Sequence, residues 1–200
     1  MSTNVTFNEV AGRKNFGPDH ALVTTPQPCV MIATWDENHT PDVMMAAWAG
    51  QYDYKQIVVS MSRHRTTENL ERTGAFTVSF ADVRTVAESD YFGLVSGAKV
   101  PDKVARAGFT ASPSPNVDAP IINEFPLCLE CEFVEYQGDE TGVGVIGKVV
   151  NVTADEAVMK NGKVDMTLVD AIAFDPYTHG YYRVSERVGD AFKDGLKLKK

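Results

Sequence analysis

Short apolar or alternating segments, separated by turn-forming residues, recur along this chain. Cys29–Trp35 is an apolar run closed by Asp-Glu-Asn, and Ile57–Met61 is rich in β-branched residues. Across Ala75–Phe80, apolar and polar side chains alternate with the period of a half-buried strand. Leu127–Gln137 continues through a Gly-Asp-Glu-Thr-Gly turn into Val143–Val152, which predicts a β-hairpin. The recurrence favours a mainly β fold.

Helical patterns interrupt the predicted strands in only a few places. Thr66–Thr73 is expected to be a helix that a Thr caps and that ends before Gly74. Val83–Val95 predicts a second helix, and Pro101–Gly108 a short third one. The inserts do not alternate regularly with strands, and no Gly-x-Gly-x-x-Gly follows the first strand, which disfavours a Rossmann nucleotide site. We expect a β-barrel with helices packed outside it.

Length and composition indicate one globular domain. The 200 residues are 44% hydrophobic and 23% charged, as in ordinary folded proteins. Residues 1–25 are polar and irregular and are expected to form an N-terminal arm, with residues 26–200 as a single domain. The only candidate linker is the loop 109–126. We find no apolar run long enough to span a membrane and no secretory signal, so a cytoplasmic protein is expected.

Charge and cysteine content exclude several classes of function. A formal net charge of −8 argues against nucleic-acid binding, because that needs a basic surface. Cys128 and Cys131 form a C-x-x-C, but on an alternating strand their sulfurs point to opposite faces, so buried free thiols are expected. The histidines are scattered, without a metal-binding spacing or a nucleophile motif. We therefore expect no metal site and no catalytic nucleophile.

The densest internal cationic cluster is Arg63-His64-Arg65-Thr66-Thr67, between a predicted strand and a predicted helix. Unpaired N–H groups and the helix dipole bind anions at such a junction, and arginine offers paired donors suited to phosphate. Charge runs are also common on solvated surfaces. The residues alone leave two interpretations open, a phosphate site and a solvated turn capped by Thr66.

A second candidate is the run Met44-Met45-Ala46-Ala47-Trp48 within Pro41–Gly50. Its small residues would let a flat ring approach the backbone closely, while sulfur and indole groups line that ring. Ordinary core packing is the alternative, and composition alone favours that alternative.

Eight segments of the chain stand in an order and at a spacing that together are specific. They are Pro28–Val30, Val43–Gly50, Ser62–Asn69, Gly74–Ser79, Asp90–Gly97, Asp102-Lys103, Pro126–Cys131 and Val188–Phe192. In this order they resemble the flavin reductase-like family, and within it the flavoredoxin-like branch of FMN-binding split barrels. The resemblance covers most of the chain, from about residue 28 to residue 192.

The resemblance implies a split β-barrel that binds FMN at or near the interface of a homodimer. It implies that one segment lies along the flavin ring, that a second holds the phosphate and that three further residues close the site. In that order these residues are Met44, Met45, Ala46, Ala47 and Trp48; Ser62, Arg63, His64, Arg65 and Thr66; and Ser96, Gly97 and Lys103. Family members commonly carry Asn and Thr around the first Met, where this chain has Asp42 and Met45.

The implied function is that of an FMN-binding oxidoreductase. The flavin itself transfers the hydride or electrons, so no catalytic side chain is expected. An NAD(P)H-dependent flavin reductase, with NADH or NADPH as reductant, and a flavoredoxin-like electron carrier that serves a redox partner protein both remain open. Two further alternatives are a non-enzymatic FMN-binding module for storage or sensing, and a structural domain without a ligand.

Overall fold

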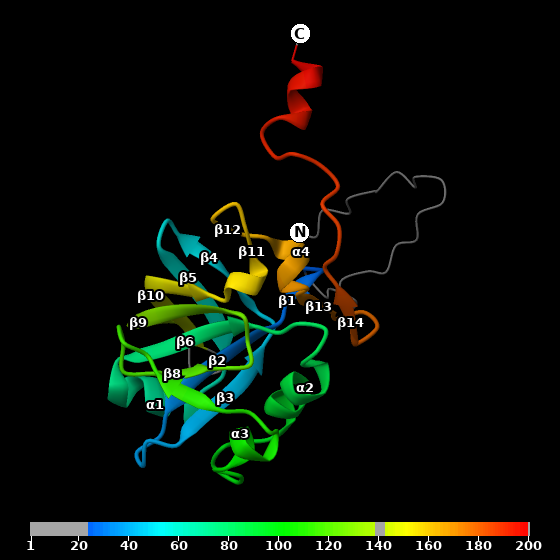
Figure 1. The fold of residues 1–200 in the computed structure, drawn as a ribbon. Coiled ribbons are helices and arrows are strands. Elements are labelled where there is room, and N and C mark those ends of the chain that lie inside the picture. Colours follow the sequence, from blue (N-terminus) through cyan, green and yellow to red (C-terminus); the bar gives the residue numbers. More distant parts are fainter. Residues whose placement is uncertain (1–23, 139–142, 200) are drawn as a thin grey trace, which may run out of the picture.

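The computed structural model describes residues 24–138 and 143–199, so nearly all of the expected N-terminal arm lies outside the described residues. A seven-stranded antiparallel sheet with the order β3-β2-β6-β9-β10-β5-β4 dominates the fold (Figure 1). Its strands are β2 (Val30–Trp35), β3 (Pro41–Ala46), β4 (Ala49–Asp53), β5 (Gln56–Met61), β6 (Ala75–Phe80), β9 (Leu127–Gln137) and β10 (Val143–Ala154). The mainly β fold with helical inserts is confirmed.

Smaller elements surround this sheet. A second sheet consists of β1 (Gln27–Pro28), β13 (Ile172–Asp175) and β14 (Gly180–Arg183). Two small sheets have two strands each: β7 (Ala111–Pro113) pairs with β8 (Pro120–Ile122), and β11 (Met159–Lys160) pairs with β12 (Lys163–Val164). The helices are α1 (Arg65–Thr73), α2 (Val86–Leu94), α3 (Lys103–Arg106) and α4 (Met166–Val169), with 3-10 turns η2 (Glu156–Val158) and η3 (Asp194–Leu198). Among the described residues, no helix has the length and apolar character needed to cross a membrane.

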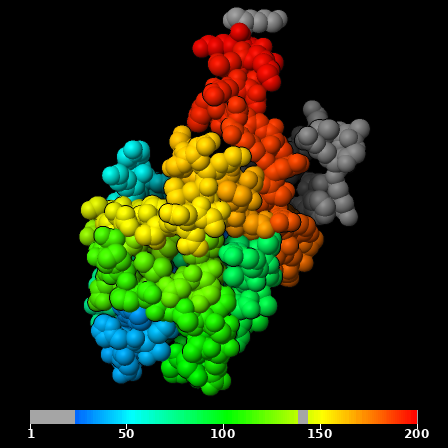
Figure 2. All heavy atoms as spheres, in the orientation of Figure 1, coloured from blue at the N-terminus to red at the C-terminus, as the bar shows by residue number. Residues whose placement is uncertain are grey.

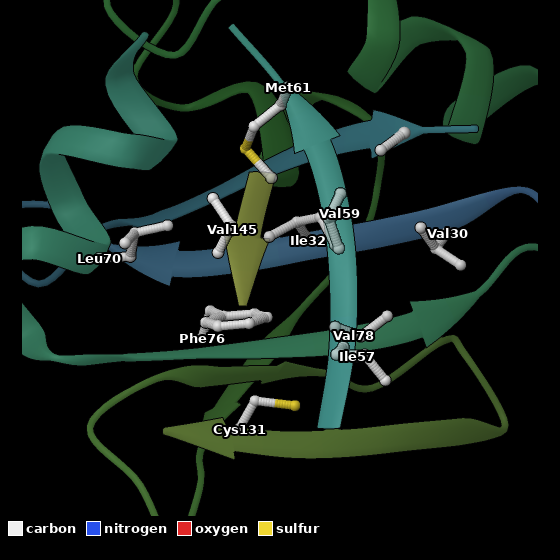
Figure 3. Close-up of a cluster of buried hydrophobic side chains, with 11 residues drawn as sticks. Val30, Ile32, Ile57, Val59, Met61, Leu70, Phe76, Val78, Cys131 and Val145 are labelled. Carbon is white, nitrogen blue, oxygen red and sulfur yellow. The ribbon is translucent and has the colours of Figure 1, made fainter. Parts of the chain in front are cut away.

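The interior of the barrel is filled by side chains from the strands around it and from α1. Figure 3 shows them converging: Val30, Ile32, Ile57, Val59, Met61, Leu70, Phe76, Val78, Cys131 and Val145. A second cluster lies outside the sheet, where Phe92 of α2 and Val104 of α3 pack with Met31 of β2. The sheet is therefore covered on both faces where the candidate site lies.

The prediction that β6 is half buried was wrong. Both faces of β6 are buried, because it lies between β2 and β9 and because β8 covers its outer face. The Thr77 hydroxyl, expected to meet water, donates a 2.6 Å hydrogen bond to the carbonyl of Pro120.

The segment 109–126, expected to be a loop and candidate linker, instead covers the sheet and contains β7 and β8. Glu130, on β9, anchors this segment although its side chain is fully buried. The carboxylate accepts hydrogen bonds from Ser114, from Asn116 at 2.9 Å and from Asn151 at 2.6 Å. Burial alone raises the pKa of Glu130, but these hydrogen bonds outweigh it and lower that pKa below its usual value.

Candidate functional site

A cavity of about 250 Å³ opens where β5 passes into α1. Its walls come from the edge of β3, the start of α1, the end of α2 with the residues after it, and α3. The predicted residues that line it are Met44, Met45, His64, Arg65, Thr66, Ser96, Gly97 and Lys103. The structure thus brings together parts of all three predicted groups, which lie far apart in the sequence.

The start of α1 is organised by His64 rather than by the Thr that the sequence predicted as the cap. The His64 Nδ1 accepts a 3.3 Å hydrogen bond from the Thr66 amide, and Thr67 Oγ1 accepts one of 2.9 Å from the His64 amide. Burial lowers the pKa of His64, which keeps the ring neutral and leaves Nδ1 free to accept. The other end of the helix is as predicted, with Gly74 in a left-handed conformation at a φ of 69°.

The two arginines of the cationic cluster point in different directions. Arg65 lines the cavity, where its guanidinium pairs with Glu37 and lies 3.7 Å from Glu68. Arg63 instead pairs with Glu71 at 2.8 Å, and its guanidinium lies 5.0 Å from the centre of the Tyr136 ring. Arg63 and Ser62 do not line the cavity, so among the described residues Arg65 alone supplies a guanidinium there.

A buried ion pair forms the floor of the cavity. Lys103 Nζ lies 2.8 Å from Asp42 Oδ1, with side-chain exposures of only 2% and 6%. The same ammonium donates to the carbonyl of Val95 at 3.1 Å, and the Thr66 hydroxyl donates to Asp42 Oδ2 at 3.1 Å. A Cβ on Gly97 would fall 2.2 Å from Asp42 Oδ1, so only glycine lets the chain pass so close to the pair.

Sequence reasoning missed this pairing. Asp42 stood out only as a departure from the family pattern, and Lys103 only as a residue that closes the site. No local pattern signals that residues so distant in sequence meet, since the contact exists only once α3 packs beside β3. With its charge matched by Asp42, Lys103 ties α3 to β3, and Asp42 in turn accepts a hydrogen bond from Thr66 at the start of α1.

The Met44–Trp48 segment divides between the core and a second hollow. Ala46 is buried in the barrel core, which is the packing that composition favoured for this run. Ala47 and Trp48 instead line a hollow of about 480 Å³, here called the Trp48 hollow, together with Pro28 and Val58. Trp48 is 62% exposed, so core packing does not account for it.

These features together fit a ligand with an anionic end and a flat apolar part. Arg65 and the Ser96 hydroxyl offer donors to an anion, and the thioethers of Met44 and Met45 line the same cavity. At about 250 Å³ the cavity lies below the roughly 300–1,000 Å³ of sites that enclose a whole drug-sized ligand. It is therefore large enough for one end of such a ligand rather than for the whole of it.

The two cysteines of the C-x-x-C occupy opposite faces of β9, as predicted. Cys131 lies in the barrel core, whereas Cys128 lies on the other face near Thr77 and Ser79. Both thiols are free and buried, and burial raises the pKa of each. Within residues 24–138 and 143–199, no group of three or more His, Cys, Asp or Glu side chains is arranged to hold a metal ion.

Comparisons with known proteins place this architecture among flavoproteins. Residues 22–174 match the model of the flavin reductase like domain. The flavoredoxin of Desulfovibrio vulgaris (Miyazaki F) is 31% identical with a TM-score of 0.82, over 94% of this chain and 100% of that one. A flavoredoxin from Methanosarcina acetivorans is 24% identical with a TM-score of 0.84, over 93% and 100% of the two chains. An FMN-binding protein from Thermus thermophilus is 18% identical with a TM-score of 0.71, over 95% and 99%.

Proposed function

We propose, because this chain belongs to the flavin reductase-like domain family, that it is an oxidoreductase that binds FMN in the cavity at the start of α1. The observation that carries the proposal is the position of Arg65, which lines one cavity with Met44 and Met45. A guanidinium beside an apolar wall is the arrangement that a phosphate joined to a flat ring requires. Similarity to flavoredoxins supports a flavin-linked redox function.

The residues of the chain would bind and orient the cofactor rather than react. FMN, when bound, supplies the ring that accepts and releases hydride or electrons. Arg65 and Ser96 would hold the phosphate, and Met44 and Met45 would contact the apolar part of the flavin. The buried pair of Asp42 and Lys103 would keep the cavity walls in place.

Two roles fit this site, an NAD(P)H-dependent flavin reductase and a carrier that receives electrons from a redox partner protein. Anaerobic stopped-flow mixing of the FMN-loaded protein with NADH and with NADPH separates them. A reductase loses the visible absorbance of oxidised flavin rapidly with one of the two nucleotides. A carrier is reduced by dithionite but by neither nucleotide at a useful rate. Protein whose bound flavin dithionite cannot reduce would contradict both roles and point to storage or sensing.

A Cys128→Ser, Cys131→Ala double variant is expected to bind FMN and to be reduced as the wild type is. The two thiols lie on opposite faces of β9 and are buried, so they cannot form a redox pair with each other. The Cys131→Ala change removes a side chain from the barrel core, so the assay is run well below the melting temperature. A variant that binds FMN normally but cannot be reduced would overturn this prediction.

The proposal includes a homodimer, as the family resemblance implies. Trp48, Tyr52 and Tyr54 lie on or beside β4, an edge strand of the large sheet, and all three side chains are exposed. Exposed aromatic groups that gather at one edge of a protein mark an interaction surface.

A further inference from the structure

The guanidinium that would hold the phosphate already faces carboxylates of its own chain. Arg65 Nη2 pairs with Glu37 and lies 4.0 Å from Asp36 Oδ2. On the other side of the group, Arg65 Nη1 lies 3.7 Å from Glu68 Oε2. Arginine binds a phosphate through the same parallel N–H donors with which it binds a carboxylate. A phosphate that enters the cavity therefore competes with these side chains for Arg65.

Asp36 is held in place by the turn to which it belongs. This turn joins β2 to β3, and Figures 1 and 2 show it at the surface, in blue at the lower left. Asp36 Oδ1 accepts 2.8 Å hydrogen bonds from the amides of Asn38 and Thr40, and the Asp36 amide donates one of 2.9 Å to the Thr40 carbonyl. The buried carboxylate of Asp36 thus closes the turn, and a phosphate could displace it only by opening the chain there.

Glu68 is stabilised by the helix that carries it. It lies in the first turn of α1, where the unpaired N–H groups and the helix dipole favour a negative charge. Its carboxylate lies 3.7 Å from Arg65 Nη1, which is an ion pair but too long for a hydrogen bond, and its side chain is 68% exposed. Glu68 is therefore a weak competitor for the guanidinium.

Glu37 is the carboxylate that competes for Arg65 most directly. It accepts a hydrogen bond from Arg65 Nη2, and within residues 24–138 and 143–199 its carboxylate makes no other hydrogen bond or ion pair. The Glu37 side chain is 55% exposed, whereas that of Arg65 is 25% exposed. The Glu37 side chain can therefore turn outward into water without breaking another polar contact, while the hydrogen bonds of Asp36 keep the turn closed.

The fold, rather than the ion pair, places Glu37 beside Arg65. Glu37 lies in the turn just beyond the last paired residues of β2 and β3. The same end of β2 carries Thr34, whose buried hydroxyl accepts a 3.1 Å hydrogen bond from Asn69 Nδ2 of α1. This bond fixes α1 against β2 and so holds the start of the helix near the turn. The backbone of Glu37 therefore stays beside Arg65 even when the two side chains separate.

We propose that Glu37 competes with the phosphate of FMN for Arg65 and so determines how tightly the site binds a flavin that carries a phosphate. The inference rests on the proposed function, because it needs the phosphate to bind at Arg65. As the phosphate binds, the Glu37 side chain turns outward and its carboxylate becomes hydrated. The apparent affinity for FMN is then reduced by the fraction of protein in which Arg65 is free. Riboflavin, which has no phosphate, is not subject to this competition.

Glu37→Gln is expected to tighten FMN binding by about threefold to tenfold and to leave riboflavin binding unchanged. Loss of an exposed ion pair accounts for up to about fivefold, and loss of the repulsion between carboxylate and phosphate adds to it. Fluorescence titration with both flavins measures the change. Glu71→Gln is the matched control, because Glu71 pairs with Arg63 at 2.8 Å outside the cavity and its loss should alter neither affinity.

The same substitution in an Arg65→Ala background shows whether Glu37 acts through Arg65. Without the guanidinium there is nothing to compete for, so only the repulsion between carboxylate and phosphate remains. The gain in FMN affinity from Glu37→Gln should therefore be clearly smaller than in the wild-type background, and a double-mutant cycle measures that difference. Equal gains in the two backgrounds would show that Glu37 only repels the phosphate, contrary to the proposal.

Two further results would overturn the competition. Weaker FMN binding by Glu37→Gln would mean that Glu37 orients Arg65 toward the phosphate, and unchanged FMN binding would mean that the guanidinium holds both anions at once. In either case, a wild-type protein that binds FMN more tightly than riboflavin would retain the proposed FMN site. Equal wild-type affinities for the two flavins would instead remove the phosphate site, and the competition with it.

Discussion

Asp42→Asn is expected to lower the free energy of unfolding by about 3–5 kcal/mol, the usual cost of removing one partner of a buried ion pair. The change keeps the shape of the side chain but leaves the Lys103 ammonium, only 2% exposed, without its counter-charge. Urea unfolding at neutral pH measures the loss. An Asp42→Asn, Lys103→Met double variant should recover most of it, because neither charge then remains in the interior.

The neighbouring pair of Asp102 and Arg106 provides the matched control. Its atoms are also 2.8 Å apart, but both side chains are largely exposed to water. Asp102→Asn should therefore destabilise the protein far less than Asp42→Asn. If the two single variants unfold at the same urea concentration, the buried pair does not hold the cavity together.

Arg65→Ala is expected to weaken FMN binding by roughly tenfold to a hundredfold and to leave riboflavin binding almost unchanged. A hydrogen bond to a charged group contributes about 1.5–3 kcal/mol, and each 1.4 kcal/mol is about tenfold in affinity. Riboflavin carries the same ring without the phosphate. Removing Arg65 also leaves the carboxylates of Glu37 and Glu68 without this partner, and their repulsion of a phosphate in the cavity would act on FMN alone.

Fluorescence titration of both flavins against wild type, Arg65→Ala and Arg72→Ala checks this prediction. Arg72 lies in the last turn of the same helix, where it donates to the carbonyl of Trp35, so its loss should affect neither flavin. Added salt should weaken FMN binding mildly in the wild type and hardly at all in Arg65→Ala. An equal loss of affinity for both flavins would mean that Arg65 supports the fold or the binding of the flavin ring. No loss for either would place the phosphate elsewhere.

The positions of the main elements could be predicted from local sequence patterns. The hairpin of β9 and β10 and the end of α1 at Gly74 follow from strand alternation, turn residues and glycine conformation. These features depend on neighbours in the sequence, so a single chain reveals them. The cap at His64 was missed because histidine is not among the residues that usually cap the start of a helix.

Tertiary contacts account for what the sequence did not reveal. Thr77 and Ser79 have the polar pattern of a solvent face, and only the position of β8 shows that they are buried. The sequence pattern indicates that Glu130 is exposed on its strand, whereas in the folded chain it is buried and accepts hydrogen bonds from Asn116 and Asn151. Neighbouring side chains at the end of a strand often point apart, so Arg63 was the less certain phosphate partner, and its contacts with Tyr136 and Glu71, outside the motif, hold it away from the cavity.

The central claim is that the cavity at the start of α1 binds FMN through its phosphate. The most direct test is a titration of the wild-type protein with FMN and with riboflavin under identical conditions. FMN should bind with one flavin per chain and, by the contribution expected of Arg65, at least about tenfold more tightly than riboflavin. Equal affinity for the two flavins, or no binding of either, would contradict the claim.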